Sequence, residues 1–67
     1  MIRLTVNGES MQLYSANNLQ EVLDKLHLGA QRVAVEVNCE IIPRSLHAQT
    51  RVREGDRIEI VRAIGGG

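Results

Sequence analysis

The chain has 67 residues, eight basic and eight acidic side chains, and no formal net charge at pH 7. This length allows one small domain with little depth for a catalytic cleft, which argues against an enzyme that acts alone. The balanced charge and the single aromatic residue, Tyr14, argue against nucleic-acid binding. No stretch is long enough to span a membrane, and the lone Cys39 suits a reducing compartment, so we expect a cytoplasmic protein.

The first predicted element is a β-hairpin. Residues 2–6 alternate between apolar and polar side chains, which is the period of a half-buried strand. The dipeptide Asn7-Gly8 follows, and it predicts a two-residue turn in which both residues take positive φ. A returning strand is expected over residues 10–14.

A single main helix is predicted over residues 19–27. Its apolar residues recur at the i, i+3, i+4, i+7 spacing of one helix face. Asn18 followed by Glu21 matches a capping box at the N-terminus. Gly29 is expected to close the helix in a left-handed conformation.

The second half of the chain predicts three more strands. Residues 33–38 alternate as a third strand, a turn at Asn38-Cys39 leads into residues 40–42, and Pro43 stops the pairing.

A helical turn is expected over residues 45–48, and a tight turn at residues 54–56 leads into a last strand over residues 57–62. Together these elements predict an α+β domain of the β-grasp type, with one main helix packed on a mixed sheet of four to five strands.

No cluster of side chains predicts catalysis or metal binding. His27 and His47 are expected on the surface, and neither has a nearby partner at metal-ligand spacing. Nothing in the sequence places a base beside Cys39. We therefore predict no catalytic residue and no metal site in this chain.

The glycine run at residues 65–67 is the remaining candidate for chemistry. We expect a β-grasp domain over residues 1–62 and a flexible tail over residues 63–67. Glycine has no Cβ, so such a tail can enter a channel too narrow for a side chain. The Gly67 carboxylate is the candidate reacting group, and it would need activation by a separate protein. The alternative is that glycines simply collect at a frayed end.

Taken together, these motifs resemble the ThiS sulfur carrier proteins, and the resemblance covers the whole chain. The residues that carry it are Asn7-Gly8, Leu19-x-x-Val22-Leu23-x-x-Leu26, Val35-x-Val37-Asn38-x-x-Ile41-Ile42-Pro43-Arg44, Glu54-Gly55-Asp56 and Gly66-Gly67.

The resemblance implies a ubiquitin-like β-grasp protein that is a substrate of enzymes. A ThiF-type enzyme would adenylate Gly67 with ATP and Mg²⁺, neither of which is bound by this chain. Gly65 and Gly66 would give the tail access to that enzyme. Sulfur from a donor such as a cysteine desulfurase would convert Gly67 to a thiocarboxylate. A ThiG-type thiazole synthase would then use the sulfur in thiamine biosynthesis.

We expect partner docking at Val61, Ala63 and Ile64, because these apolar residues lead directly into the reacting end. Four residues depart from the family's pattern. Cys39 stands in a turn where a polar residue is expected, and Gly65 adds a third glycine. Glu59 stands on the outer face of the last strand, where more apolar side chains are expected, and Leu46 replaces a frequent large aromatic residue.

Other functions remain open from the sequence. The small subunit of molybdopterin synthase shares the fold and the terminal diglycine, although its connection before the third strand is usually longer. A β-grasp interaction module would bind its partner without Gly66 and Gly67. A ubiquitin-like tag would form an amide-linked conjugate through Gly67.

Overall fold

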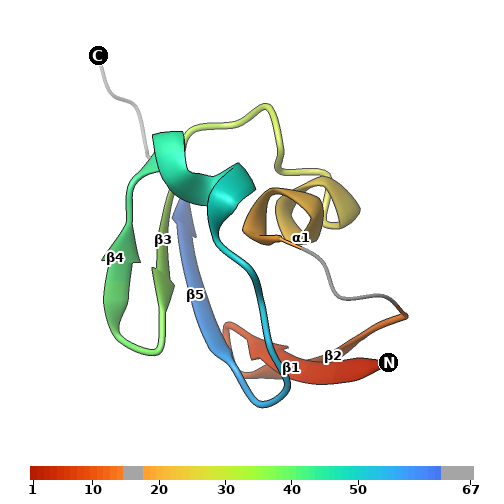
Figure 1. Cartoon of the computed structure of the whole chain (residues 1–67). Coiled ribbons are helices and arrows are strands. Elements are labelled where there is room, and N and C mark those ends of the chain that lie inside the picture. Colours follow the sequence, from red (N-terminus) through yellow and green to blue (C-terminus); the bar gives the residue numbers. More distant parts are fainter. Residues whose placement is uncertain (15–17, 63–67) are drawn as a thin grey trace.

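The computed structural model describes residues 1–14 and 18–62. Its elements, in chain order, are β1 (Ile2–Val6), β2 (Glu9–Leu13), α1 (Leu19–Lys25), β3 (Val33–Val37), β4 (Glu40–Ile42), the 3-10 helix η1 (Arg44–Gln49) and β5 (Arg57–Arg62). The five strands form one sheet in the order β2-β1-β5-β3-β4 (Figure 1). Strands β1 and β5 run parallel and the other neighbours run antiparallel. This mixed sheet with one main helix is the predicted β-grasp arrangement.

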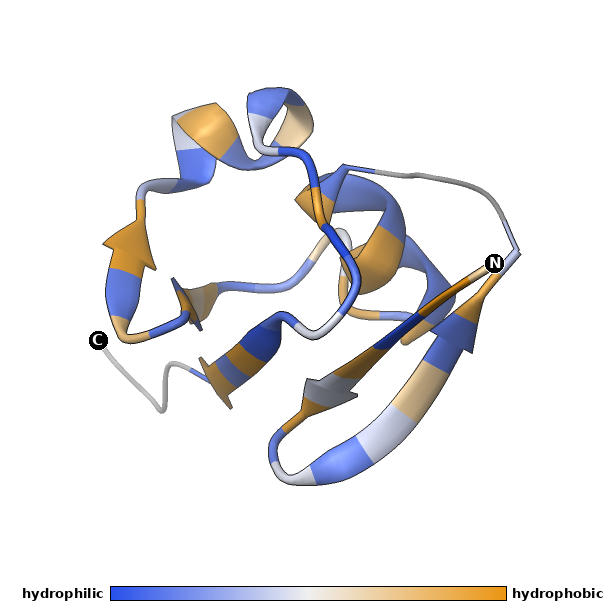
Figure 2. Cartoon of the chain, turned by 60° about the horizontal axis from the view of Figure 1, so that its bottom comes forward, coloured by the Kyte–Doolittle hydropathy of each residue, from blue (hydrophilic) through white to orange (hydrophobic). Residues whose placement is uncertain are grey.

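An aliphatic core lies between the sheet and α1. Burial alternates along β1, β3 and the first part of β5, and Figure 2 shows hydrophobic and hydrophilic residues alternating along the strands in the same way. Leu19, Val22 and Leu23 come from α1 and face the sheet. The fully buried strand residues are Leu4, Leu13, Val35 and Ile58. The opposite face of the sheet carries exposed or half-buried side chains, so the described part of the chain leaves it uncovered.

Helix α1 begins as predicted. The Glu21 amide donates to Asn18 Oδ1 at 2.9 Å, and the Asn18 amide donates to Glu21 Oε1 at 3.2 Å. Each residue thus satisfies a backbone donor of the other, which confirms the capping box.

The prediction for the end of α1 was wrong. The α-helix ends at Lys25, and the left-handed residue is His27, with φ 62°, instead of Gly29. The His27 amide donates to the Asp24 carbonyl at 3.0 Å and the Leu28 amide to the Leu23 carbonyl at 2.8 Å, which is a Schellman motif. At Gly29 a Cβ would meet Asp24 Oδ1, the end of an exposed side chain, so a larger residue there would require Asp24 to move.

His47 lies inside the protein, which corrects the surface position expected for it. It is 2% exposed, and its Nε2 is 3.0 Å from the Ile42 carbonyl oxygen. The segment that carries it, η1, is longer at both ends than the single turn predicted over residues 45–48. The imidazole joins η1 to the end of β4, so its role there is structural. His27 is exposed, as predicted.

Both predicted hairpin turns are confirmed. Asn7 and Gly8 have φ of 52° and 85°, and Asn38 and Cys39 have φ of 52° and 71°. Positive φ at both central residues matches the right-handed twist of the flanking strands. Asn tolerates this conformation and Gly adopts it without steric cost. The Cβ of Cys39 makes positive φ unfavourable at that position.

Candidate functional site

The candidate site begins where β5 ends. Of the residues predicted to dock or react, Val61 is described, whereas Ala63, Ile64, Gly65, Gly66 and Gly67 lie outside the described residues, as does the predicted tail over residues 63–67. Strand β5 is the middle strand of five, and its register with β3 continues to the pair Val33 and Arg62. The chain therefore reaches residue 63 directly from the centre of the sheet.

Two asparagine side chains hold β5 from opposite sides. Asn7 Oδ1 accepts from the Ile60 amide at 2.7 Å, and Asn7 Nδ2 donates to the Ile60 carbonyl at 3.2 Å. Asn38 Oδ1 accepts from the Arg57 amide at 2.9 Å. The sequence indicated only turns at these positions. The side-chain contacts were missed because they join residues 53 and 19 positions apart.

Val61, one of the residues predicted to dock, lies on the uncovered face of the sheet. It is 65% exposed and stands opposite Ala34 of β3. The structure adds Ile41, which is 70% exposed and stands opposite Glu36 on the same face. Ile41 was missed because two adjacent isoleucines in a short strand do not reveal which one points inward.

A pair of like charges lies among these apolar residues. Glu36 and Glu59 are directly opposite each other on β3 and β5, and Ile41 continues the same row onto β4. Like charges in this arrangement destabilise a sheet. We call Ala34, Glu36, Ile41, Glu59 and Val61 the outer patch.

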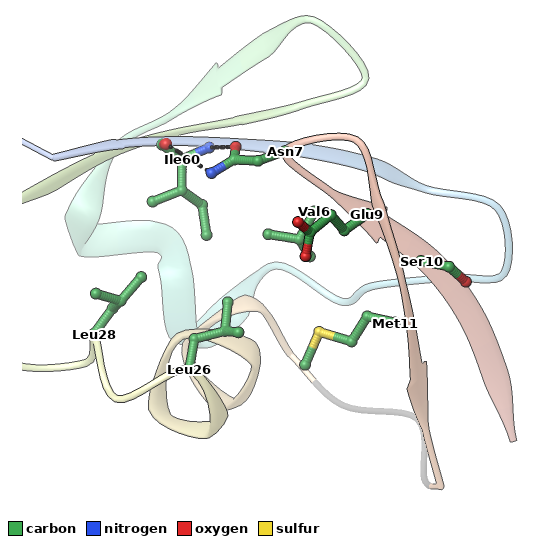
Figure 3. A pocket seen from close by; sticks show the side chains of 8 residues that line it. All are labelled: Val6, Asn7, Glu9, Ser10, Met11, Leu26, Leu28 and Ile60. Atoms are coloured by element: carbon green, nitrogen blue, oxygen red, sulfur yellow. Dashed lines mark hydrogen bonds between the residues drawn. The ribbon is translucent and has the colours of Figure 1, made fainter.

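The helix-covered side has an open pocket of about 400 Å³ beside β5 (Figure 3). Its apolar lining comes from the first hairpin, the end of α1 and β5. These apolar residues are Val6, Met11, Leu26, Leu28 and Ile60. Among the described residues that line it, Glu9 is the one with an ionisable side chain, so these residues do not pair an acid with a base.

The ionisable side chains elsewhere do not converge. Across residues 1–14 and 18–62, no group of three or more His, Cys, Asp or Glu side chains could hold a metal ion. Glu54 accepts a hydrogen bond from the Arg3 amide at 2.7 Å, and Asp56 accepts one from the Arg53 amide at 2.7 Å. Cys39 is exposed at a hairpin turn. These two carboxylates therefore accept hydrogen bonds from backbone amides. The described residues do not place a nucleophile beside a base.

Residues 4–67 match the sequence profile of the ThiS family. The chain is a member of the ThiS family. The match extends over both the described sheet and the predicted tail. The sulfur carrier protein ThiS of Escherichia coli K12 is 30% identical over 66 residues, which are 98% of this chain and 100% of that protein.

A solved structure of a ThiS protein has the same fold. The crystal structure of the thiamine biosynthesis protein ThiS from Geobacter metallireducens superposes with a TM-score of 0.83 at 35% identity. The superposition covers 98% of this chain and 100% of the Geobacter metallireducens chain. The β-grasp prediction is thereby confirmed.

A ThiS-like region also occurs within a longer protein. A thiazole synthase from Paramagnetospirillum magneticum is 41% identical over 66 residues, which are 98% of this chain and 20% of that protein. This chain thus spans about a fifth of the length of that relative. Among the residues that the structure describes, no helix has the length and apolar character needed to cross a membrane.

Proposed function

We propose that this ThiS-family chain is a sulfur carrier in thiamine biosynthesis and that the Gly67 carboxylate carries the sulfur. The family match carries this proposal, because it continues through residue 67 and therefore includes the glycine run. The relative from Escherichia coli, which the chain matches over its full length, is named as a sulfur carrier. The central position of β5 supports the proposal, since the tail follows a strand that is paired on both sides.

The proposed chemistry starts from an unreactive group. A carboxylate resists attack because its charge is delocalised and oxide is a poor leaving group. In the proposed sequence the Gly67 carboxylate attacks the α-phosphorus of ATP and releases pyrophosphate. Sulfide then displaces AMP, so that one C–O bond breaks, one C–S bond forms and Gly67 becomes a thiocarboxylate. If the sulfur arrives as a persulfide, the product is an acyl disulfide, and a thiol must reduce its S–S bond to release the thiocarboxylate. Gly65 and Gly66 would let the backbone pass close to the nucleotide, because neither has a side chain.

The proposal assigns the catalytic work to other proteins. A ThiF-type enzyme would bind ATP and Mg²⁺, and a cysteine desulfurase is the proposed source of sulfur. A ThiG-type thiazole synthase is the proposed acceptor, because a relative of that name contains a ThiS-like region. The chain itself would be a protein substrate, in keeping with the separated ionisable groups of its described part. We place it in the cytoplasm, where its single Cys39 would stay reduced.

We propose that the outer patch, continued by Ala63 and Ile64, is the docking surface for these enzymes. The exposed Val61 and Ile41 supply apolar area, and the patch leads along β5 toward the tail. Replacing Ile64 with Asp should weaken binding to the adenylating enzyme about tenfold, because a charge would be desolvated in the contact. Unchanged affinity in a titration would contradict this assignment.

Intact-mass spectrometry tests the carrier function. The chain is incubated with ATP, Mg²⁺, the adenylating enzyme of the same organism and sodium sulfide. We expect a mass gain equal to the difference between sulfur and oxygen, and its loss when Gly67 is deleted. An amide-linked conjugate of higher mass would indicate a tag instead. No gain with an enzyme that is active on another ThiS protein would contradict the proposed function.

A further inference from the structure

Strand β5 extends beyond the end of its parallel neighbour, β1. The β1 register with β5 comprises Thr5 with Arg57 and Val6 with Ile58, and the Asn7 amide then donates to the Ile58 carbonyl at 2.8 Å. At Asn7 the chain turns away into β2, so β1 offers no backbone partner to Ile60.

The side chain of Asn7 takes the place of the missing strand. Its carboxamide has one acceptor and one donor group, and these meet the N–H and C=O of Ile60 (Figure 3). The contact therefore replaces the two hydrogen bonds that Ile60 would make to two successive backbone partners if β1 continued in parallel. It is the last hydrogen-bonded contact of β5 on the β1 side within the described residues, and it lies two residues before Arg62.

We infer that Asn7 is a positioning residue for the reaction at the C-terminus: by bonding Ile60 it fixes the point from which the tail leaves the sheet. This inference rests on the proposed carrier function. Without the carboxamide, β5 would be bonded on the β1 side only as far as Ile58. The enzyme would then have to order extra residues when it captures the tail, at a cost in conformational entropy.

The turn alone does not account for an asparagine at this position. A type I′ turn accepts glycine at its first central residue, so replacing Asn7 with Gly keeps the backbone conformation and removes the carboxamide. The second hairpin provides a matched control. Asn38 has the same φ of 52° and also bonds β5, but at Arg57, the end of the strand away from the tail.

The test compares Asn7→Gly with Asn38→Gly as substrates of the adenylating enzyme, with pyrophosphate exchange as the assay. We expect the KM for Asn7→Gly to rise about fivefold, equivalent to about 1 kcal/mol, with kcat unchanged because Gly67 itself is unaltered. Asn38→Gly should stay within about twofold of the wild type in KM. Asn7→Asp keeps the acceptor for the Ile60 amide and should give an intermediate KM.

Amide hydrogen exchange at Ile60 provides a second readout that does not need an enzyme. The Ile60 amide should exchange faster in Asn7→Gly and keep its wild-type rate in Asn38→Gly. Equal KM for the two glycine variants, or an unaltered Ile60 exchange rate, would overturn the positioning role. If Asn7→Gly does not fold, Asn7→Asp carries the same comparison. A wild-type chain that is not adenylated would instead overturn the proposed function together with this inference.

Discussion

The two faces of the sheet differ in what covers them. The face toward α1 presents Leu4, Val35 and Ile58, all at most 1% exposed. The opposite face presents Val61 and Ile41 at 65% and 70% exposure, beside a pair of like charges. Strand β5 contributes alternate residues to both faces. Stability thus depends on one side of this strand and the proposed docking on the other, so that each can be altered separately.

The largest expected effect comes from breaking the covered face. Ile58→Ala should lower the free energy of unfolding by about 2–5 kcal/mol, because it leaves a cavity in the core. A domain of this size has a small core, which supplies little stability beyond what folding requires. Val61→Ala, at an outward position of the same strand, should change it by no more than about 0.5 kcal/mol. Urea denaturation followed by circular dichroism measures both. Similar losses in the two variants would show that the faces are not separate.

A smaller effect is expected from the uncovered face. Val61→Ser and Ile41→Ser should each weaken binding to thiazole synthase about fivefold, because they remove apolar area from the proposed contact. Their thermal unfolding midpoints should stay close to that of the wild type. Calorimetric titration measures the affinity.

Tyr14→Ser is the matched control for this experiment. Tyr14 is 79% exposed and lies after β2, outside the outer patch, so its replacement should leave binding unchanged. If all three serine variants bind equally, docking occurs on another surface.

The smallest effect concerns the paired carboxylates. Glu59→Gln should raise the free energy of unfolding by about 0.2–1 kcal/mol, because it removes the repulsion with Glu36. Glu40→Gln removes the same charge from the helix-covered side of β4 and should have no such effect. Thermal melts of the two variants at low ionic strength measure the difference. An equal response would mean that net charge, rather than the cross-strand pair, sets the stability.

The elements could be predicted because their signals are local. The capping box joins Asn18 to Glu21, three positions apart, and the turn at Asn7-Gly8 needs only two residues. The alternation of the strands likewise separates inward from outward residues without knowledge of the partner strands. Each of these signals is a local preference, either for a backbone conformation or for placing apolar side chains on one face. The folded structure keeps these local preferences.

The errors have a different origin. Gly29 looked like a helix cap, yet α1 ends at Lys25 and the left-handed residue that follows it is His27, two positions before Gly29. His47 could not be placed inside from sequence, because its partner is the Ile42 carbonyl and its burial depends on how η1 packs. For the candidate site, Val61 is exposed and its docking role stays a prediction. The contact of Asn7 with Ile60 could not be predicted without the order of the strands in the sheet. The predicted roles of residues 63–67 stay predictions.

The central position of β5 also has a consequence for biosynthesis. The hairpins β1–β2 and β3–β4 can form from neighbouring residues, but β5 must enter between them and pair over separations such as the 53 residues from Asn7 to Ile60. Such long-range pairing comes late and slows folding. A nascent chain that stops before β5 would hold two hairpins with no strand to join them. Completion of the sheet and presentation of the tail would therefore coincide during synthesis.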